Sequence, residues 1–299
     1  MNPFDLPGPD FLLFYAIFSA AVIAILVLSR RVSEGGPPPK IDLADAYLIA
    51  YLRGGENETA RVAMVSLIDR RVLEASGTTV KAAKGVSKDS VRRPIEKLLV
   101  ERFAHSGEAT SIFSDSSVKS ACRDYKLTLE ARDLLPDAAT SGKRFGKFAI
   151  AAVILAGTGA IKIAIALSRG RTNIGFLIVL TVIVTVAAYV VTFPRVTRKG
   201  AALLEDIKGL YAGLKQRATF IKPGGATADA LMLMSVFGVA ALAGEGFGYT
   251  RQLFPKAAAS SASGTSWWSS GSSCGSSCGS SCGSSCGGGC GGGCGGCGS

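Results

Sequence analysis

The sequence contains very little histidine, tryptophan and methionine, and almost no cysteine outside its C-terminal end. His105 is the only histidine in the 299 residues. Catalytic arrangements that need a histidine base, such as Ser-His-Asp or Cys-His, can therefore involve that residue alone. Because His105 precedes Ser106-Gly107 in a predicted loop, we expect it to be a solvated surface residue. We expect no enzymatic activity.

Cysteine is nearly absent from the first 273 residues, where Cys122 is the single exception. The other seven of the eight cysteines lie close to the C-terminus. A disulfide framework needs structured elements between its thiols, and the sequence between these seven consists of glycine and serine. Cys122 is predicted to be a small core or surface residue without a functional thiol.

Acidic residues are scarce relative to basic ones, and the formal net charge is +11. Residues 40–144 contain 18 basic and 15 acidic side chains, whereas residues 195–222 contain seven basic and two acidic ones. Positive charge therefore gathers beside the apolar segments, as expected for cytoplasmic flanks that meet anionic lipid headgroups. This distribution favours the lipid bilayer as a partner and argues against nucleic acid.

Three segments are apolar over about 20 residues, the length of a helix that crosses a bilayer. They are residues 11–29, 148–168 and 174–193, and Lys162 is the only charged residue within them. We expect Lys162 to snorkel toward the nearby loop. Acidic residues before the first segment and arginines after it place the N-terminus outside and the following domain in the cytosol. The chain is thus predicted to be a multi-pass inner-membrane protein.

The first half of the chain divides where its composition changes. Residues 1–31 are predicted to form an N-terminal transmembrane anchor, and residues 32–40, with three successive prolines, a Pro/Gly linker. Residues 41–142 are polar enough for a cytosolic domain. Residues 143–199 are predicted to form a transmembrane hairpin of two spans joined by a short loop.

The 41–142 domain shows helical periodicity on both sides of a short alternating stretch. Periodic apolar positions predict helices over 43–54, 57–71, 90–104 and 117–135, with Asn57 as the cap of the second. The alternating runs around Ser76-Gly77 predict a two-strand wing. This order resembles the winged-helix arrangement. We expect an α+β scaffold that binds a protein partner, and DNA binding through the second helix is the alternative.

Two further segments follow the hairpin. Residues 200–227 are basic and amphipathic, and are predicted to lie along the membrane surface. Residues 228–247 have an uncharged core of 15 residues, bounded by Asp229 and Glu245. That length is short for a span. This short apolar helix is either a fourth span or a re-entrant helix, and the C-terminus lies outside only if it crosses.

Residues 248–299 form a low-complexity Gly/Ser/Cys tail that is predicted to be disordered. Soft thiolates bind Zn or Cu(I), so the tail thiols are candidate metal ligands. Three alternatives stay open: modification of the Ser and Cys side chains, as in thiazole- and oxazole-modified microcins, oxidation or cross-linking, and no dedicated role. The thiols are Cys274, Cys278, Cys282, Cys286, Cys290, Cys294 and Cys297.

Four stretches and the tail together resemble a bacterial family of uncharacterised membrane proteins. The stretches are NPFDLPGPDFLLFY, AYLRGGENETARVAMVSLIDRRVLEASG, GRTNIGFLIVLTVIVTV and FPRVTRKG. The resemblance covers nearly the whole chain. It implies a membrane domain with a helical soluble insert and a Gly- or Cys-rich end in the bacterial plasma membrane. It implies no activity, catalytic residue or cofactor.

The sequence therefore predicts a mainly α protein with three transmembrane helices, or four if residues 228–247 cross the membrane. The first functional hypothesis is a tether or scaffold that presents a metal- or redox-responsive tail. The second is a membrane-held substrate whose tail is modified or cross-linked by partner enzymes. The third is a membrane-tethered DNA-binding regulator.

Overall fold

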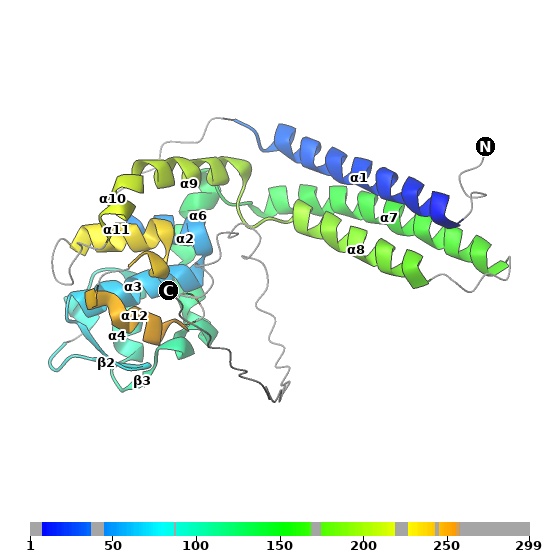
Figure 1. Cartoon of the computed structure of the whole chain (residues 1–299). Helices are drawn as coiled ribbons and strands as arrows, with labels where there is room; N and C mark the ends of the chain where they lie inside the picture. The colour runs from blue at the N-terminus through cyan, green and yellow to red at the C-terminus, as the bar shows by residue number, and fades with distance from the viewer. Residues whose placement is uncertain are drawn as a thin grey trace, which may run out of the picture.

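The structure, a computed structural model, describes residues 8–36, 45–86, 88–168, 175–218, 227–242, 245–255 and 257. It is mainly helical, with a rod of three long helices beside a globular module (Figure 1). The helices of the described residues are α1 (Gly8–Ser33), α2 (Ala46–Gly54), α3 (Glu56–Asp69), α4 (Pro94–Arg102), α5 (Ser117–Ala121), α6 (Arg123–Ala131), α7 (Ala138–Ser168), α8 (Gly175–Thr192), α9 (Arg198–Leu210), α10 (Ala212–Gln216), α11 (Thr227–Phe237) and α12 (Gly248–Leu253).

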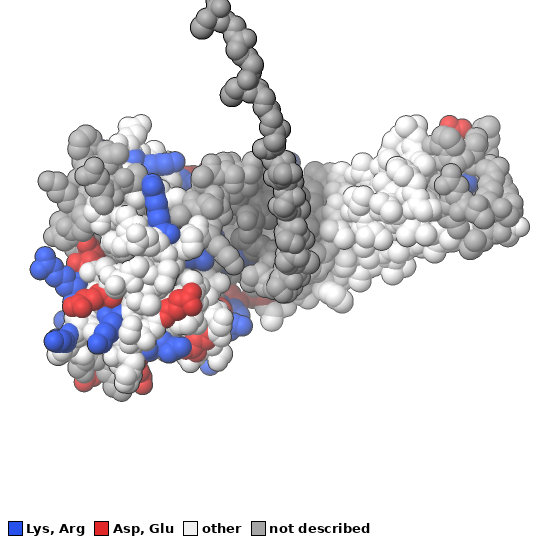
Figure 2. Space-filling view, turned by 60° about the horizontal axis from the view of Figure 1, so that its bottom comes forward, with Lys and Arg blue, Asp and Glu red and all other residues white. Residues whose placement is uncertain are grey.

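The rod consists of α1, α7 and α8. Among the described residues, these are the three helices long and apolar enough to cross a membrane, over Asp10–Ser33, Ala138–Ile165 and Gly175–Thr192. On the face that Figure 2 shows, the described surface of the rod is nearly free of charged side chains, whereas Lys, Arg, Asp and Glu side chains are scattered over the module. Large apolar residues such as Leu13 and Val153 remain 68% and 72% exposed on it. An apolar surface of this kind is compatible with the interior of a bilayer.

Close contacts hold the rod together. The Tyr15 hydroxyl donates a hydrogen bond to the carbonyl of Leu155 at 3.1 Å, which satisfies a buried polar group. A Cβ atom at Gly159 would lie 2.9 Å from Oγ1 of Thr181, so glycine lets α7 and α8 approach closely. Nζ of Lys162 lies 4.5 Å from the ring centroid of Phe11, toward the end of the rod where α1 begins.

Helix α2 lies at the centre of the module. All residues from Ala46 to Leu52 are buried. Four helices pack against it: α3, α6, α9 and α11. A helix that is apolar on every side has to be surrounded by other elements in this way. The carboxylate of Asp45 caps the helix by accepting hydrogen bonds from the N–H groups of Tyr47 and Leu48.

The module also contains a small antiparallel sheet, which lies at its edge (Figure 1). Strand β1 (Leu73–Ser76) pairs with β2 (Thr79–Ala82), and Gly77 with φ +60° occupies the turn between them. Strand β3 (Gly107–Glu108) adds to the other edge of β2. Short 3₁₀ helices occupy Lys88–Ser90, Ala109–Ser114, Val239–Ala241 and Glu245–Phe247. The strand pair around Ser76-Gly77 lies where the sequence predicts it.

Helix boundaries in the module differ from the sequence prediction, beginning with the helix predicted over 43–54, which starts at Ala46 after its cap residue Asp45. Helix α3 begins at Glu56 with Gly55 in the cap position, in place of Asn57. The helix predicted over 90–104 begins at Pro94, because proline suits a first helical turn and restricts the residue before it. The helix predicted over 117–135 is divided at Cys122 into α5 and α6, and it ends at Ala131.

Helices α9 and α11 occupy the module core, and both predicted membrane placements are corrected. The sequence places 200–227 on the membrane surface, but its apolar residues Leu203 and Ile207 are buried in the core. The sequence also predicts 228–247 as a fourth span or re-entrant helix. Helix α11 instead packs against α2 and α3. It contains 11 residues, about 16 Å, which is much shorter than the roughly 30 Å of the hydrocarbon core.

In the sequence, the hairpin of α7 and α8 interrupts the module. The core cluster draws residues from Tyr47 to Leu135 and again from Leu203 to Phe254, so the chain leaves the module for α7 and returns to it after α8. The predicted tail boundary at 248 is also corrected, because α12 lies beyond it and Leu253 and Phe254 are buried in the core. The helix α1 extends to Ser33, which takes Val32 and Ser33 out of the predicted 32–40 linker.

Candidate functional site at the membrane junction

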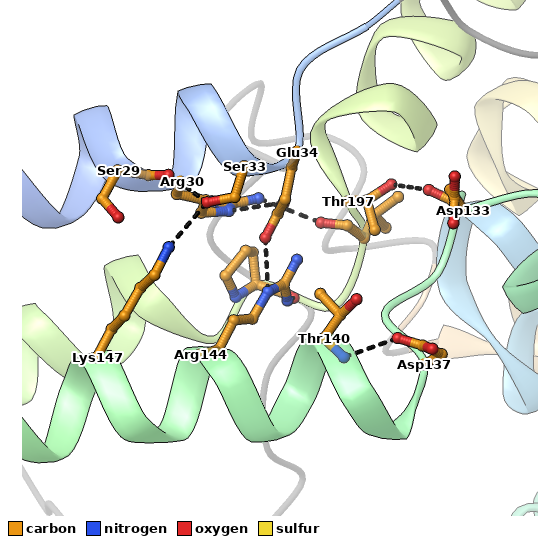
Figure 3. Close-up of polar contacts among 12 residues, drawn as sticks. Ser29, Arg30, Ser33, Glu34, Asp133, Asp137, Thr140, Arg144, Lys147 and Thr197 are labelled. Atoms are coloured by element: carbon orange, nitrogen blue, oxygen red, sulfur yellow. Dashed lines mark hydrogen bonds and ion pairs between the residues drawn. The ribbon is translucent and has the colours of Figure 1, made fainter.

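Three pieces of chain meet where the rod joins the module: the end of α1, the start of α7, and the 193–197 connection between α8 and α9 (Figure 3). Glu34 lies at their centre and is 8% exposed. Its Oε1 accepts a hydrogen bond from Nε of Arg144 at 2.7 Å, and its Oε2 accepts one from Nε of Arg30 at 3.1 Å. One carboxylate therefore joins α1 to α7.

The same two arginines bind the connection that leaves α8. Nη1 of Arg144 donates to the carbonyl of Pro194 at 2.8 Å, and Nη2 of Arg30 donates to the carbonyl of Val196 at 3.3 Å. Both carbonyls lie in the connection between the two helices, outside any helix, and the guanidinium groups supply their hydrogen-bond donors. Together with Glu34, these two arginines thus fix the three long helices to one another at this end.

Thr197 joins the connection to the module. Its N–H donates to the carbonyl of Leu134 at 3.1 Å, and its Oγ1 lies 2.6 Å from the carbonyl oxygen of Asp133. The same Oγ1 accepts from the N–H of Gly200 at 3.2 Å and so caps α9. A Cβ atom at Gly200 would lie 2.4 Å from the Leu134 carbonyl oxygen, so only glycine permits this approach.

Arg195 extends from the connection toward α2. Its Nη1 donates to the carbonyl of Leu52 at 3.2 Å, and its Nη2 donates to the carbonyl of Tyr51. Gly55, which follows α2, has φ +77°, and a Cβ atom there would lie 3.0 Å from Nη2 of Arg195. Burial lowers the pKa of the Arg195 guanidinium. Because an arginine stays protonated despite this shift, the hydrogen bonds of Arg195 to the two carbonyls are charge-assisted.

The electrostatics of the junction favour an ionised Glu34. Burial alone would raise the pKa of its carboxyl group. Hydrogen bonds and charge from Arg144 and Arg30 outweigh that effect and hold the pKa below its ordinary value of 4.5. The carboxylate is accordingly charged near neutral pH and neutralises only part of the positive charge around it.

A cavity of about 170 Å³ lies beside these contacts. Nη2 of Arg144 is buried and has no hydrogen-bond partner among the described residues. Lys147 donates to Oγ of Ser33 at 2.8 Å, and Lys199 pairs with the Asp133 carboxylate at 3.0 Å. The arrangement has the properties of an anion site. The charged residues that line the cavity are Arg30, Lys143, Arg144, Lys147, Lys199, Glu34 and Asp133.

The predicted metal ligands, the seven tail cysteines from Cys274 to Cys297, lie outside the described residues. Within the described part of the chain, no group of three or more His, Cys, Asp or Glu residues could hold a metal ion. Cys122 is fully buried, and burial raises the pKa of its thiol to about 12. His105 is exposed on the module.

The junction contains residues that the sequence did not identify as a site. Basic residues at the ends of the spans were expected, but Glu34, Thr197 and Arg195 were not singled out. One sequence signal existed: Glu34 follows Arg30 by four residues, the spacing of a helical ion pair. The partners of Thr197 and Arg195 lie more than 60 and 140 residues away in the chain, so no local pattern identifies them.

No protein-family model, curated protein sequence or solved structure matches this chain. The resemblance to a bacterial membrane-protein family therefore stays a prediction. The site described above rests on its geometry alone.

Proposed function

We propose that the protein is a membrane-anchored scaffold that holds a helical interaction module at one face of the bilayer and carries its thiol-rich segment on that same face. The observation that carries this proposal is the packing of α11 and α12 in the module core. Ala257, the last described residue, packs against that core. The chain therefore continues toward the tail from the module and not from the rod.

The junction supports the scaffold role because it fixes the module to the rod. Glu34 links α1 to α7, Thr197 links the α8–α9 connection to the carbonyls of Asp133 and Leu134, and Arg195 binds α2. These contacts hold the module in a fixed position relative to the rod, since each of them joins segments that are far apart in the sequence. Charge bias at the ends of α1 supports an N-terminus outside and a module in the cytosol of a bacterium.

The module is the proposed protein-binding part, with the winged-helix-like arrangement of α2, α3 and the β1–β2 pair as its framework. Balanced charge over residues 40–144 favours a protein partner over DNA. On the cytosolic face the tail thiols would be kept reduced. Reduced thiolates suit binding of Zn or Cu(I) or a response to oxidants better than permanent cross-linking.

The proposal is tested by finding which side of the membrane the tail thiols occupy. Three full-length chains are compared in intact cells with a membrane-impermeant maleimide, before and after permeabilisation. The first keeps the natural tail. The other two have the seven tail cysteines replaced by serine and carry one reporter, Asp10→Cys at the start of α1 or Ser106→Cys on the module. Both positions are exposed, and buried Cys122 contributes no background.

We expect Asp10→Cys to react from outside, and Ser106→Cys and the natural tail to react only after permeabilisation. Opposite reactivity of the two reporters establishes which side each end of α1 faces. A tail that reacts together with Asp10→Cys would overturn the proposal, because the chain would then cross the membrane after α12.

A further inference from the structure

We propose that the junction cavity binds the phosphate group of an anionic lipid, with the guanidinium of Arg144 as its buried contact. This inference concerns the rod–module junction and does not depend on the role proposed for the tail. It rests on an unpartnered buried donor, on the charge of the cavity lining, and on the position of the cavity at the end of the membrane helices.

The unpartnered donor is Nη2 of Arg144. The residue is 6% exposed, its Nε is bound to Glu34 and its Nη1 to the carbonyl of Pro194. Nη2 is buried without a partner within the described chain. A buried charged donor without an acceptor is costly. The planar guanidinium group matches the geometry of the oxygen atoms of a phosphate group. A phosphate oxygen would therefore accept the hydrogen bond that Nη2 can donate.

The charge of the lining selects an anion. Five cationic and two anionic side chains line the cavity, which leaves a net charge of +3. The two acids are already engaged, because Glu34 is shared by two arginines and Asp133 accepts from Lys199. Lys143 is exposed at the edge of the cavity and is available to an entering ligand.

The position of the cavity indicates a lipid as the source of the phosphate. Leu26 and Thr192 contribute to its wall, and both belong to membrane-span candidates. Thr192 is the last residue of its span, so the cavity lies where lipid headgroups begin. Basic pockets between membrane helices are common headgroup sites. A volume of about 170 Å³ is smaller than the roughly 300–1,000 Å³ of drug-sized sites, which suits a phosphate group better than a nucleotide.

The test uses the full-length protein in an uncharged detergent and follows thermal unfolding while dioctanoyl phosphatidylglycerol is added. Ligand that binds only the folded state raises the unfolding temperature with a saturable dependence on concentration. Octanoate, an anionic amphiphile without phosphate, and inorganic phosphate at matched ionic strength are titrated in parallel. We expect saturable stabilisation by phosphatidylglycerol, a weaker effect of inorganic phosphate, and none from octanoate.

Three variants locate the site. Lys143→Gln removes an exposed cation from the lining and is expected to weaken the apparent affinity about fivefold. Arg144→Lys retains the charge but replaces the three guanidinium nitrogens with one ammonium nitrogen, which cannot bind Glu34 and Pro194 and also reach the phosphate group. It is expected to weaken the apparent affinity about tenfold or more. Arg31→Gln is the matched control, since Arg31 is exposed at the same end of α1 and does not line the cavity. Its expected effect is less than about twofold.

The outcomes separate the possibilities. Equal losses in Lys143→Gln and Arg31→Gln would overturn the site, because general surface charge would then explain the binding. Stabilisation by octanoate equal to that by phosphatidylglycerol would also overturn it. Inorganic phosphate that binds as tightly as the lipid would overturn the lipid as the source. Lys143→Gln keeps these results interpretable even if Arg144→Lys fails to fold, since Lys143 is solvent-exposed.

Discussion

Glu34 and Arg144 are 110 positions apart in the sequence, and their side chains form a buried ion pair with 2.7 Å between Oε1 and Nε. Each side chain is 7% exposed. The pair joins α1 to α7 at the level where the membrane helices meet the module. Because both charges are withdrawn from water, each depends on the other for compensation.

Loss of the Glu34 charge is expected to destabilise the protein strongly. Glu34→Gln keeps the size of the side chain but leaves two arginines without their counter-charge, at an expected cost of about 3–5 kcal/mol in the free energy of unfolding. Denaturant unfolding of the full-length chain in detergent measures it. Glu205→Gln is the control, because Glu205 pairs with Lys208 at the surface with its side chain 73% exposed. Its expected cost is less than about 1 kcal/mol, and equal costs would contradict the prediction.

The junction also predicts a pH dependence of stability. The pKa of Glu34 in the folded protein lies below the ordinary 4.5. Its ionised form therefore stabilises the fold fully above that ordinary value, and this contribution is lost as the pH falls through the folded-state pKa. We expect Glu34→Gln to remove that part of the acid dependence. The unfolding temperatures of both chains across the acidic range test it, and parallel curves would refute it.

Gly55 is predicted to be irreplaceable because of both its backbone conformation and Arg195. Gly55→Ala introduces a Cβ atom at φ +77° and 3.0 Å from the guanidinium. Gly85→Ala is the matched control, since Gly85 has φ +81° and nothing within 4 Å of the added atom. Both substitutions are expected to lower the free energy of unfolding by about 1 kcal/mol or more because of backbone strain. A greater loss of unfolding free energy is expected for Gly55→Ala, because Gly55 combines the Arg195 contact with φ +77° and ψ −154°, a backbone region that only glycine readily adopts. Equal losses would contradict this prediction.

The packing of α7 on α8 can be tested with a second pair of glycine substitutions. Gly159→Ala places a Cβ atom 2.9 Å from Oγ1 of Thr181, whereas Gly157→Ala meets nothing within 4 Å. Both substitutions gain about 1 kcal/mol of helix propensity, so their difference isolates the packing cost, expected at about 1–3 kcal/mol. The unfolding temperature in detergent should fall for Gly159→Ala relative to Gly157→Ala. If it does not, α7 and α8 do not pack closely at this point.

Cys122 is expected to be inert in the folded protein. Its thiol is fully buried, and its pKa is raised to about 12, so little thiolate forms near neutral pH. In a chain whose seven tail cysteines are replaced by serine, a thiol reagent such as dithionitrobenzoate should react only after denaturation. Reaction within the mixing time under native conditions would show that the α5–α6 region opens readily.

Much of the local structure follows from patterns within a few residues. Three long apolar runs predict three membrane-span candidates, and they are found. The alternating residues around Gly77 predict the β1–β2 pair, and the periodicity over 43–54 predicts α2, which begins at Ala46 after its cap residue Asp45. These features depend on periodicity, capping and turn chemistry, which neighbouring residues determine on their own.

Sequence patterns thus predict which segments are apolar enough for lipid and which form short helices and strands. The fold alone shows that α9 and α11 cover α2, because an amphipathic or short apolar helix can bury its apolar face equally well in lipid or protein. It also decided which distant charges meet, as Glu34 and Arg144 do. Contacts between residues so far apart leave no periodic trace in the sequence, since each is fixed by the packing of whole helices.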